Sequence, residues 1–390
     1  MRLNWSGNAH LTFCLNVFPA GTLAELDAAL FVQAPAVFQR VAQLTGHGGP
    51  WGIGLWLPAQ LAETLDQSAV SRLTEQLASH RLYVFTVNAF PYGMFHGQRV
   101  KDNVYLPDWS DPRRLTYTLR AAQILAQVLP PGTPGSISSV PVAYRPRSTA
   151  ERLTAAGQHL GKAALELSRL QEKTGKMIRL ALEPEPGCVI EDSASAVDVF
   201  EHWLIPAAVC QLHEKHGLAK HTAEELFRDH IGICLDTVHC AVMFEAAADS
   251  LRRLTSAGLR VWKIQLGAAL ATESRGEAPP ALAQFCDPIY LHQTRIQTLK
   301  GIFDFADLPL ALAAPQAGEW RVHYHVPRTW RGQSGLRTAD AAANEDFFKL
   351  AESCGVAHYE VELYTLPLLT GSGENVNEVI ARDVALVVRQ

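Results

Sequence analysis

The chain has 390 residues, of which 48% are hydrophobic and 19% charged, a composition that excludes a disordered or fibrous protein. Its 34 basic and 39 acidic residues give a net charge of −5, and no run of five like charges occurs. The sequence therefore lacks the basic patch that is typical of proteins that bind nucleic acids or anionic lipids, and we expect neither as a partner.

Seven cysteines are scattered along the chain and never form a C-x-x-C pair, so the sequence predicts neither a disulfide framework nor a thiolate zinc site. We assign them no catalytic role. The first ten residues lack the apolar core of a signal peptide, and no stretch approaches the roughly 18 apolar residues of a membrane-spanning helix. We therefore expect a cytoplasmic protein without membrane insertion.

Short runs rich in β-branched and aromatic residues alternate with longer stretches whose apolar residues recur every three or four positions. This alternation predicts repeated β-α units and a parallel sheet, the α/β class. In chain order, the predicted strands are His10–Val17, Gly52–Leu57, Leu82–Asn88, Ile137–Ala143, Ile178–Glu183, Gly232–Asp236, Arg260–Leu266, Trp320–Val326 and His358–Leu363. The predicted helices are Leu23–Leu44, Gln60–Ser79, Pro112–Val128, Thr149–Lys173, Ala194–His216, Ala241–Ala257, Thr338–Cys354 and Glu374–Val388.

Eight helices and nine candidate strands favour a (β/α)8 TIM barrel, with residues 1–390 as a single domain and one strand in excess. Such a barrel needs about 250 residues. We therefore expect long loops on the carboxyl-terminal face of the barrel, in the non-periodic stretches Pro91–Asp111 and Gly267–Glu319. The alternative, an open doubly wound sheet, lacks its usual G-x-G-x-x-G phosphate loop here.

Three predicted strands end near a carboxylate, at Glu183, Asp236 and Glu362. The carboxyl ends of barrel strands converge on one mouth, and three carboxylates there would repel each other unless a cation lies among them. The pattern predicts a divalent metal site. The alternative is that each acid caps the following helix or pairs with an arginine. Glu185 and Glu360 are in phase with two of these acids and are alternative ligands.

Two histidine motifs strengthen the metal prediction. His239 follows Asp236 by three residues in Leu235-Asp-Thr-Val-His239, so both side chains can face one site. Carboxylate and imidazole ligands suit Zn, Mn, Fe or Co rather than Ca. His323 and His325 alternate on one predicted strand and so point to the same side. The alternative is a pair of core histidines, which we favour for His323 but not for His325.

Several polar residues are candidates for substrate binding. Gln265 ends a predicted strand, where its amide could coordinate a metal or bind a substrate oxygen. Asn88 ends another and leads into a loop that mixes aromatic residues with His96 and Lys101, a mixture that suits a polyhydroxylated ligand, although the aromatic residues could equally be anchors of the loop. The predicted substrate contacts are Asn88, His96, Lys101, Glu185, His292 and His323.

These residues resemble a known group of proteins. The acid-ended strands, Leu235-Asp-Thr-Val-His239 and Val361-Glu-Leu-Tyr364 are similar to the xylose-isomerase-like barrel superfamily of sugar isomerases, epimerases and endonuclease IV. More narrowly, four strings resemble the EboE family, called metabolite traffic proteins: Phe90-Pro-Tyr-Gly with Phe95-His-Gly, Val104-Tyr-Leu-Pro-Asp-Trp109, Glu183-Pro-Glu-Pro and His323-Tyr-His-Val-Pro327.

The resemblance implies one divalent ion held from successive strand ends by Glu183, Asp236, Gln265 and Glu362. Gln265 stands where the superfamily usually has histidine. His239 or His325 could supply the missing ligand, because the endonuclease branch uses a D-x-x-H and a D-x-H segment at comparable places.

The predicted function is that of a metal-dependent isomerase or epimerase acting on a sugar or sugar phosphate. The ion would polarise the carbonyl, and Glu183 and Glu362 would exchange the proton at the neighbouring carbon. A second hypothesis is a non-catalytic protein that binds a metabolite in the barrel mouth and passes it on unchanged. An endonuclease is less favoured, because the acidic chain has no surface that attracts DNA. The sequence leaves the oligomeric state open, a homo-oligomer included.

Overall fold

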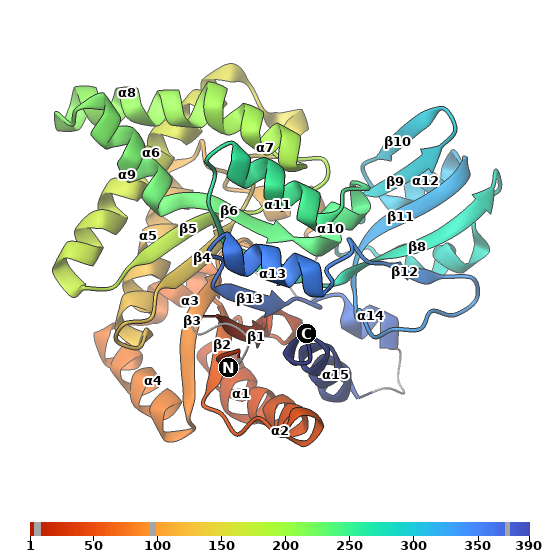
Figure 1. Ribbon diagram of the computed structural model, residues 1–390, viewed down its shortest axis with the longest axis horizontal. Coiled ribbons are helices and arrows are strands. Elements are labelled where there is room, and N and C mark those ends of the chain that lie inside the picture. The colour runs from red at the N-terminus through yellow and green to blue at the C-terminus, as the bar shows by residue number, and fades with distance from the viewer. Residues whose placement is uncertain (4–8, 94–98, 371–374) are drawn as a thin grey trace.

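A computed structural model describes residues 1–3, 9–93, 99–370 and 375–390. Eight parallel strands form a nearly closed barrel with helices between them (Figure 1), which confirms the predicted TIM-barrel fold. The barrel strands are β1 (His10–Phe13), β2 (Trp51–Trp56), β3 (Leu82–Asn88), β4 (Gly135–Ser139), β5 (Ile178–Leu182), β6 (Ile231–Asp236), β7 (Val261–Leu266) and β13 (His358–Val361).

The strands follow one another around the barrel in the order β1-β13-β7-β6-β5-β4-β3-β2, and every pairing is parallel. An isolated parallel bridge between Cys14 and Gly54 joins the two ends of this sheet. All carboxyl ends therefore open on the same face, which is where catalytic residues lie in barrels of this kind.

Most predicted helices are present, although several are divided. The long amphipathic stretch near the amino terminus is interrupted by a π-helical turn at Ala29–Gln33, and a second such turn lies at Phe200–Leu204. One helix packed around the barrel, α9, lies outside the predicted ranges. The helices around the barrel are α1 (Leu23–Ala28), α2 (Ala34–Thr45), α3 (Ala59–Thr64), α4 (Gln67–Ser79), α5 (Pro112–Val128), α6 (Ala150–Thr174), α7 (Ser193–Val199), α8 (Ile205–His216), α9 (Lys220–His230), α10 (Thr237–Val242), α11 (Ala247–Ser256), α13 (Glu345–Ser353) and α15 (Val376–Val388). Among the described helices, none combines the length and hydrophobicity needed to cross a lipid bilayer.

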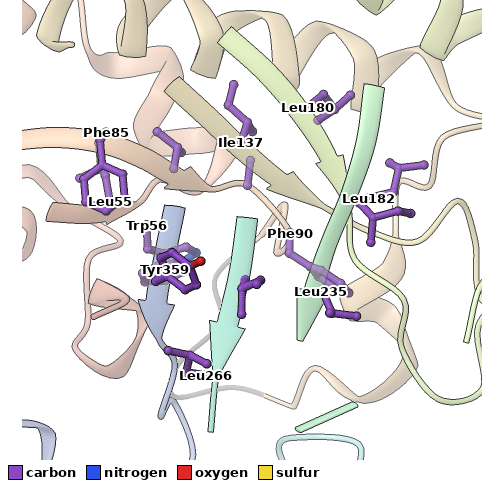
Figure 2. Close-up of a cluster of buried hydrophobic side chains, with 14 of the residues drawn as sticks. Leu55, Trp56, Phe85, Phe90, Ile137, Leu180, Leu182, Leu235, Leu266 and Tyr359 are labelled. Atoms are coloured by element: carbon purple, nitrogen blue, oxygen red, sulfur yellow. The ribbon is translucent and has the colours of Figure 1, made fainter. Parts of the chain in front are cut away.

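The apolar core lies between the strands and the surrounding helices. Figure 2 shows side chains from neighbouring strands in this core, including Leu55, Ile137, Leu180 and Leu235, all of which are buried. A barrel strand is covered by helices outside and by side chains inside, so its residues are buried on both faces. This explains the near-continuous apolar runs of barrel strands such as β2 and β6, whereas β4, with the sequence Gly-Ser-Ile-Ser-Ser, is an exception.

The segment after β7 differs from the predicted irregular loop. It forms a second sheet of five antiparallel strands, in the order β10-β9-β11-β8-β12, beside the barrel in Figure 1. Its elements, with a short helix that follows β13, are β8 (Ala268–Arg275), β9 (Thr294–Thr298), β10 (Gly301–Phe305), α12 (Leu308–Ala313), β11 (Ala317–Val326), β12 (Arg337–Ala339) and α14 (Leu366–Thr370). The ninth predicted strand, Trp320–Val326, is thus part of this second sheet and not of the barrel, because its apolar residues pack on a separate core.

That separate core orients the histidines of β11. Val322, Tyr324 and Val326 alternate along the strand and pack in a cluster with Trp320 and other residues of the second sheet. Side chains alternate between the two faces of a strand. The residues between them, at positions 323 and 325, therefore face the barrel mouth.

Candidate metal centre

Three carboxylates meet at the mouth of the barrel. Glu183 follows β5 directly, Asp236 is the last residue of β6, and Glu362 follows β13. All three are buried. One oxygen of Glu362 accepts hydrogen bonds from the Nδ2 atoms of Asn16 and Asn88, each at 2.8 Å. The parallel topology has brought to one face the acidic residues at the carboxyl ends of β5, β6 and β13.

Two of these carboxylates keep one oxygen without a partner. Asp236 caps α10, because its Oδ1 accepts from the backbone N–H of Val238 at 2.6 Å, whereas its Oδ2 has no hydrogen-bond partner among the described residues. Within the described part of the chain, the Oε2 of Glu183 is also buried without a partner. Leaving a buried charged acceptor unsatisfied is costly. Helix capping therefore explains the Oδ1 of Asp236 but not its Oδ2. The Oδ2 of Asp236 and the Oε2 of Glu183 are suited to bind a cation.

The electrostatics of the three carboxylates agree with that reading. Burial, with the neighbouring Glu362 and Asp236, raises the pKa of Glu183 well above its ordinary range. Burial, with Asp236 and Glu360, does the same to the pKa of Glu362. Burial and like charges both disfavour the ionised form. A divalent ion beside these two glutamates would oppose the shift and favour their ionised forms.

Three imidazole rings converge beside the carboxylates. The Nε2 of His323, on β11, lies 3.1 Å from the Nε2 of His239, on α10, and 3.1 Å from the Nε2 of His325. All three rings are buried. Burial, with the neighbouring histidines, lowers the pKa of His323 well below its ordinary value, and burial lowers the pKa of His325 to about 4. The cluster joins a helix of the barrel to a strand of the second sheet.

Beneath the mouth, an ion pair occupies the barrel interior. Lys263 Nζ lies 2.6 Å from Glu360 Oε2, and neither side chain is exposed. Gln265 is bound in the same region, since its Oε1 accepts from the Cys234 thiol at 3.0 Å and its Nε2 lies 3.5 Å from Glu360 Oε2. We therefore leave Gln265 and Glu360 out of the proposed ligand set.

A small cavity of about 50 Å³ lies at the mouth. Its lining includes Asn88, Lys101, Glu185, His323 and aromatic residues. Lys101 is not a free cation, because its Nζ donates to Asp307 Oδ2 at 2.6 Å and to the carbonyl oxygen of Asp287 at 2.8 Å. The ammonium of Lys101 is therefore already paired, which disfavours it as a cation for the substrate, although the residue lines the cavity.

Two other predicted substrate residues differ from expectation or cannot be placed. His292 is fully buried and stacks on Tyr324 with ring centroids 3.7 Å apart. Its Nδ1 donates to the carbonyl oxygen of His323 at 2.7 Å, so it supports β11 from behind and does not line the cavity. The substrate contact predicted for His292 is corrected accordingly. His96 lies outside the described residues.

Sequence reasoning missed several residues of the site. Asn16 holds Glu362, and its polarity within an apolar predicted strand was a usable signal. Tyr105 donates to Glu185 Oε1 at 2.6 Å, and Gln293 donates both to that oxygen, at 3.1 Å, and to the Tyr105 hydroxyl, at 2.7 Å. Gln293 lies in the stretch interpreted as a loop, so no periodic pattern could have identified it.

No family model matches this chain, and no curated protein sequence does. Several solved structures are similar to it. A xylose isomerase-like TIM barrel protein from Mycobacterium smegmatis, in complex with magnesium, is similar with a TM-score of 0.51 at 10% identity, over 98% of this chain and 96% of that one. An L-ribulose 3-epimerase has a TM-score of 0.47 at 12% identity, over 98% and 93%. The IOLI protein with a bound zinc atom has 0.46 at 14%, over 97% and 96%. The chain therefore has the xylose isomerase-like TIM-barrel fold, and at these identities the likeness concerns the fold alone.

Proposed function

We propose that this protein is a metal-dependent enzyme that moves a proton at the carbon next to a carbonyl in a small polyhydroxylated metabolite, as an isomerase or epimerase does. The observation that carries the proposal is that Asp236 lies in one potential metal-binding group with Glu183 and in another with Glu362, and that two buried oxygens of these acids have no partner among the described residues. Three buried carboxylates destabilise the fold unless they bind a cation, so their convergence favours a functional metal site over a structural role.

The ion would be held by Glu183, Asp236 and Glu362. When bound, a divalent ion polarises a carbonyl oxygen and stabilises negative charge on it. His239 and His325 are close to these carboxylates, with Nδ1–oxygen distances of 4.0 Å to Glu183 and 3.7 Å to Glu362. Both Nδ1 atoms already donate to backbone carbonyl oxygens, so they support the carboxylate site without completing its ligand set.

The chain's own groups would bind and orient the substrate. Asn16 and Asn88 fix one oxygen of Glu362 and leave the other to face the site. Glu183 and Glu362 come from strands on different parts of the barrel, which suits removal of a proton on one side of a carbon and its return on the other. The aromatic residues around the cavity, including Phe90, Tyr290 and Tyr364, offer apolar surfaces for the C–H face of a sugar.

Metal content and proton exchange test this proposal together. The protein purified without chelator should carry a divalent ion, and Glu183→Gln and Asp236→Asn should reduce its content. With a panel of aldoses and ketoses in D2O, the wild-type protein should introduce deuterium beside the carbonyl, and Glu362→Gln should abolish it.

We also propose metabolite traffic, as in the EboE family, as the biological setting of this protein. The same experiment distinguishes an enzyme from a carrier in that setting. A metabolite that binds but leaves the protein without deuterium and without rearrangement would contradict the enzyme and support a carrier. A wild-type protein that binds no divalent ion, even after reconstitution, would contradict the metal mechanism itself.

A further inference from the structure

The three-histidine cluster has a defined tautomer. His239 Nδ1 lies 2.7 Å from the carbonyl oxygen of Pro184, and His325 Nδ1 lies 3.1 Å from that of Glu362. A carbonyl oxygen only accepts hydrogen bonds, so each Nδ1 carries the proton of its ring. The Nε2 atoms of these two rings are therefore acceptors with a free lone pair.

The third ring is oriented in the same way. His323 Nδ1 lies 2.7 Å from Gln293 Oε1. The amide of Gln293 cannot be reversed, because its Nε2 donates to the carbonyl oxygen of Pro186 at 2.9 Å. His323 thus also carries its proton on Nδ1. All three rings direct Nε2 lone pairs toward one another.

Three Nε2 lone pairs that face one another repel each other unless a cation lies between them. Two of the Nε2 pairs are only 3.1 Å apart. A proton placed between two of these atoms leaves the third lone pair facing them, whereas a metal ion satisfies all three at once. Tetrahedral Zn²⁺ with Zn–N bonds of 2.0–2.1 Å separates its nitrogen ligands by roughly 3.3 Å. In each ring, the Nδ1–H group donates a hydrogen bond to an oxygen atom on the side away from the cluster. Histidines that bind a metal usually make such a bond with their other ring nitrogen, because it fixes the orientation of the ring.

The carboxylates lie on a different side of the rings. The three histidines group by themselves, whereas Glu183 and Asp236 group with His239, and Asp236 and Glu362 group with His325. These carboxylates approach the two rings at Nδ1, at distances of 3.7 to 4.0 Å. The oxygen ligands and the nitrogen ligands therefore define two neighbouring positions.

We propose that the Nε2 atoms of His239, His323 and His325 form a second cation site, separate from the carboxylate site, that takes a borderline divalent ion such as Zn²⁺, Co²⁺ or Fe²⁺. Imidazole favours such ions, whereas carboxylates also accept Mg²⁺ and Mn²⁺. Three protein ligands leave a fourth position for water or a substrate oxygen, which is the arrangement of catalytic rather than structural zinc. The Tyr364 hydroxyl lies 3.5 Å from His323 Nε2, so it is close to the proposed site.

Titration of the metal-free, full-length protein with Co²⁺ tests the site, with binding measured by equilibrium dialysis and the nitrogen-ligated ion by visible absorption. We expect about two Co²⁺ per chain, one of which excess Mg²⁺ displaces without loss of the absorption. His323→Ala and His325→Ala should each lose one ion and the absorption. Glu183→Gln should lose the other ion and keep the absorption. His230→Gln, which changes a buried histidine of α9, is the matched control and should bind as wild type.

The outcomes separate this site from the proposed function. Unchanged Co²⁺ binding in both histidine variants would overturn the second site. So would loss of the same absorbing ion in the histidine variants and in Glu183→Gln alike. Loss confined to the histidine variants would support it and contradict the carboxylate site. Because the Mg²⁺ competition uses wild-type protein, it gives an answer even if a variant fails to fold, and circular dichroism identifies that case.

Discussion

The Oε1 atom of Glu360 occupies the position that a side chain on Gly54 would need, because a Cβ added at Gly54 would lie 1.8 Å from it. This glycine therefore makes room for a carboxylate inside the barrel. The other oxygen of Glu360 binds Lys263, whose Nζ also donates to Ser138 Oγ at 3.1 Å. The ion pair and the glycine form one structural unit beneath the proposed metal centre.

Gly54→Ala should destabilise the protein, because neither the β2 backbone nor the paired carboxylate can move without breaking the ion pair. We expect a loss of about 2 to 4 kcal/mol in the free energy of unfolding, within the range of severe core substitutions. Urea denaturation measures it. Gly48→Ala, whose Cβ would meet no atom within 4 Å, is the control and should change stability little.

Lys263→Met should be as damaging or worse, because it leaves Glu360 buried without its cation. Removing one partner of a buried ion pair typically costs about 3 to 5 kcal/mol. Replacing Glu360 with Gln as well should restore much of the loss. A double variant no more stable than Lys263→Met would show that the lysine acts through packing and not through its charge.

Glu183→Gln should have opposite effects on the stability of the fold in the presence and in the absence of a divalent metal ion. In the metal-free protein it removes one of three mutually repelling carboxylates, so it should stabilise the fold at pH 7 by about 1 to 3 kcal/mol. With a divalent ion present, the wild type should be the more stable form, because the ion binds only the folded site. Thermal unfolding with and without EDTA shows both effects, and a variant destabilised in EDTA would argue that Glu183 has a structural partner.

Gln293→Met should weaken the three-histidine site without touching its ligands. Gln293 Oε1 is the acceptor that holds the proton of His323 on Nδ1. Loss of such an outer contact typically costs roughly 10- to 100-fold in metal affinity. Competition for Co²⁺ against a chelator measures the change. Tyr105→Phe, which removes a hydroxyl that binds Gln293, should have a smaller effect of the same sign.

The lowered pKa of buried His10 predicts that the protein loses stability in acid. Burial is the main cause that lowers the pKa of this histidine from 6.5 to about 4. Between pH 6.5 and about 4, His10 binds a proton in the unfolded chain but stays neutral in the folded protein. The contribution of neutral His10 to the free energy of unfolding is therefore fully present above pH 6.5 and is lost as the pH falls toward 4. Each pKa unit corresponds to roughly 1.4 kcal/mol. His10→Phe should therefore flatten the fall in unfolding free energy over this pH range, whereas His216→Gln, at an exposed position, should leave the slope unchanged.

The sequence by itself determined the barrel and the acids at its mouth. Strand periodicity and the residues that end a strand are local properties, and parallel topology brings all carboxyl ends to one face. For the same reason, Glu183, Asp236 and Glu362 could be identified from their positions along the chain, and the alternation of His323 and His325 predicted that they share one side.

Only the tertiary structure decided which nitrogen atoms meet and which candidate ligands are already bound elsewhere. The second sheet turns β11 toward the barrel, and partners remote in sequence, such as Pro184 for His239 and Gln293 for His323, fix each imidazole. Gln265, Lys101 and His292 were predicted from their positions, yet each is held by a neighbour that lies outside its own local pattern. A hydrogen bond between distant segments depends on how complete elements pack, and local periodicity contains no record of that packing.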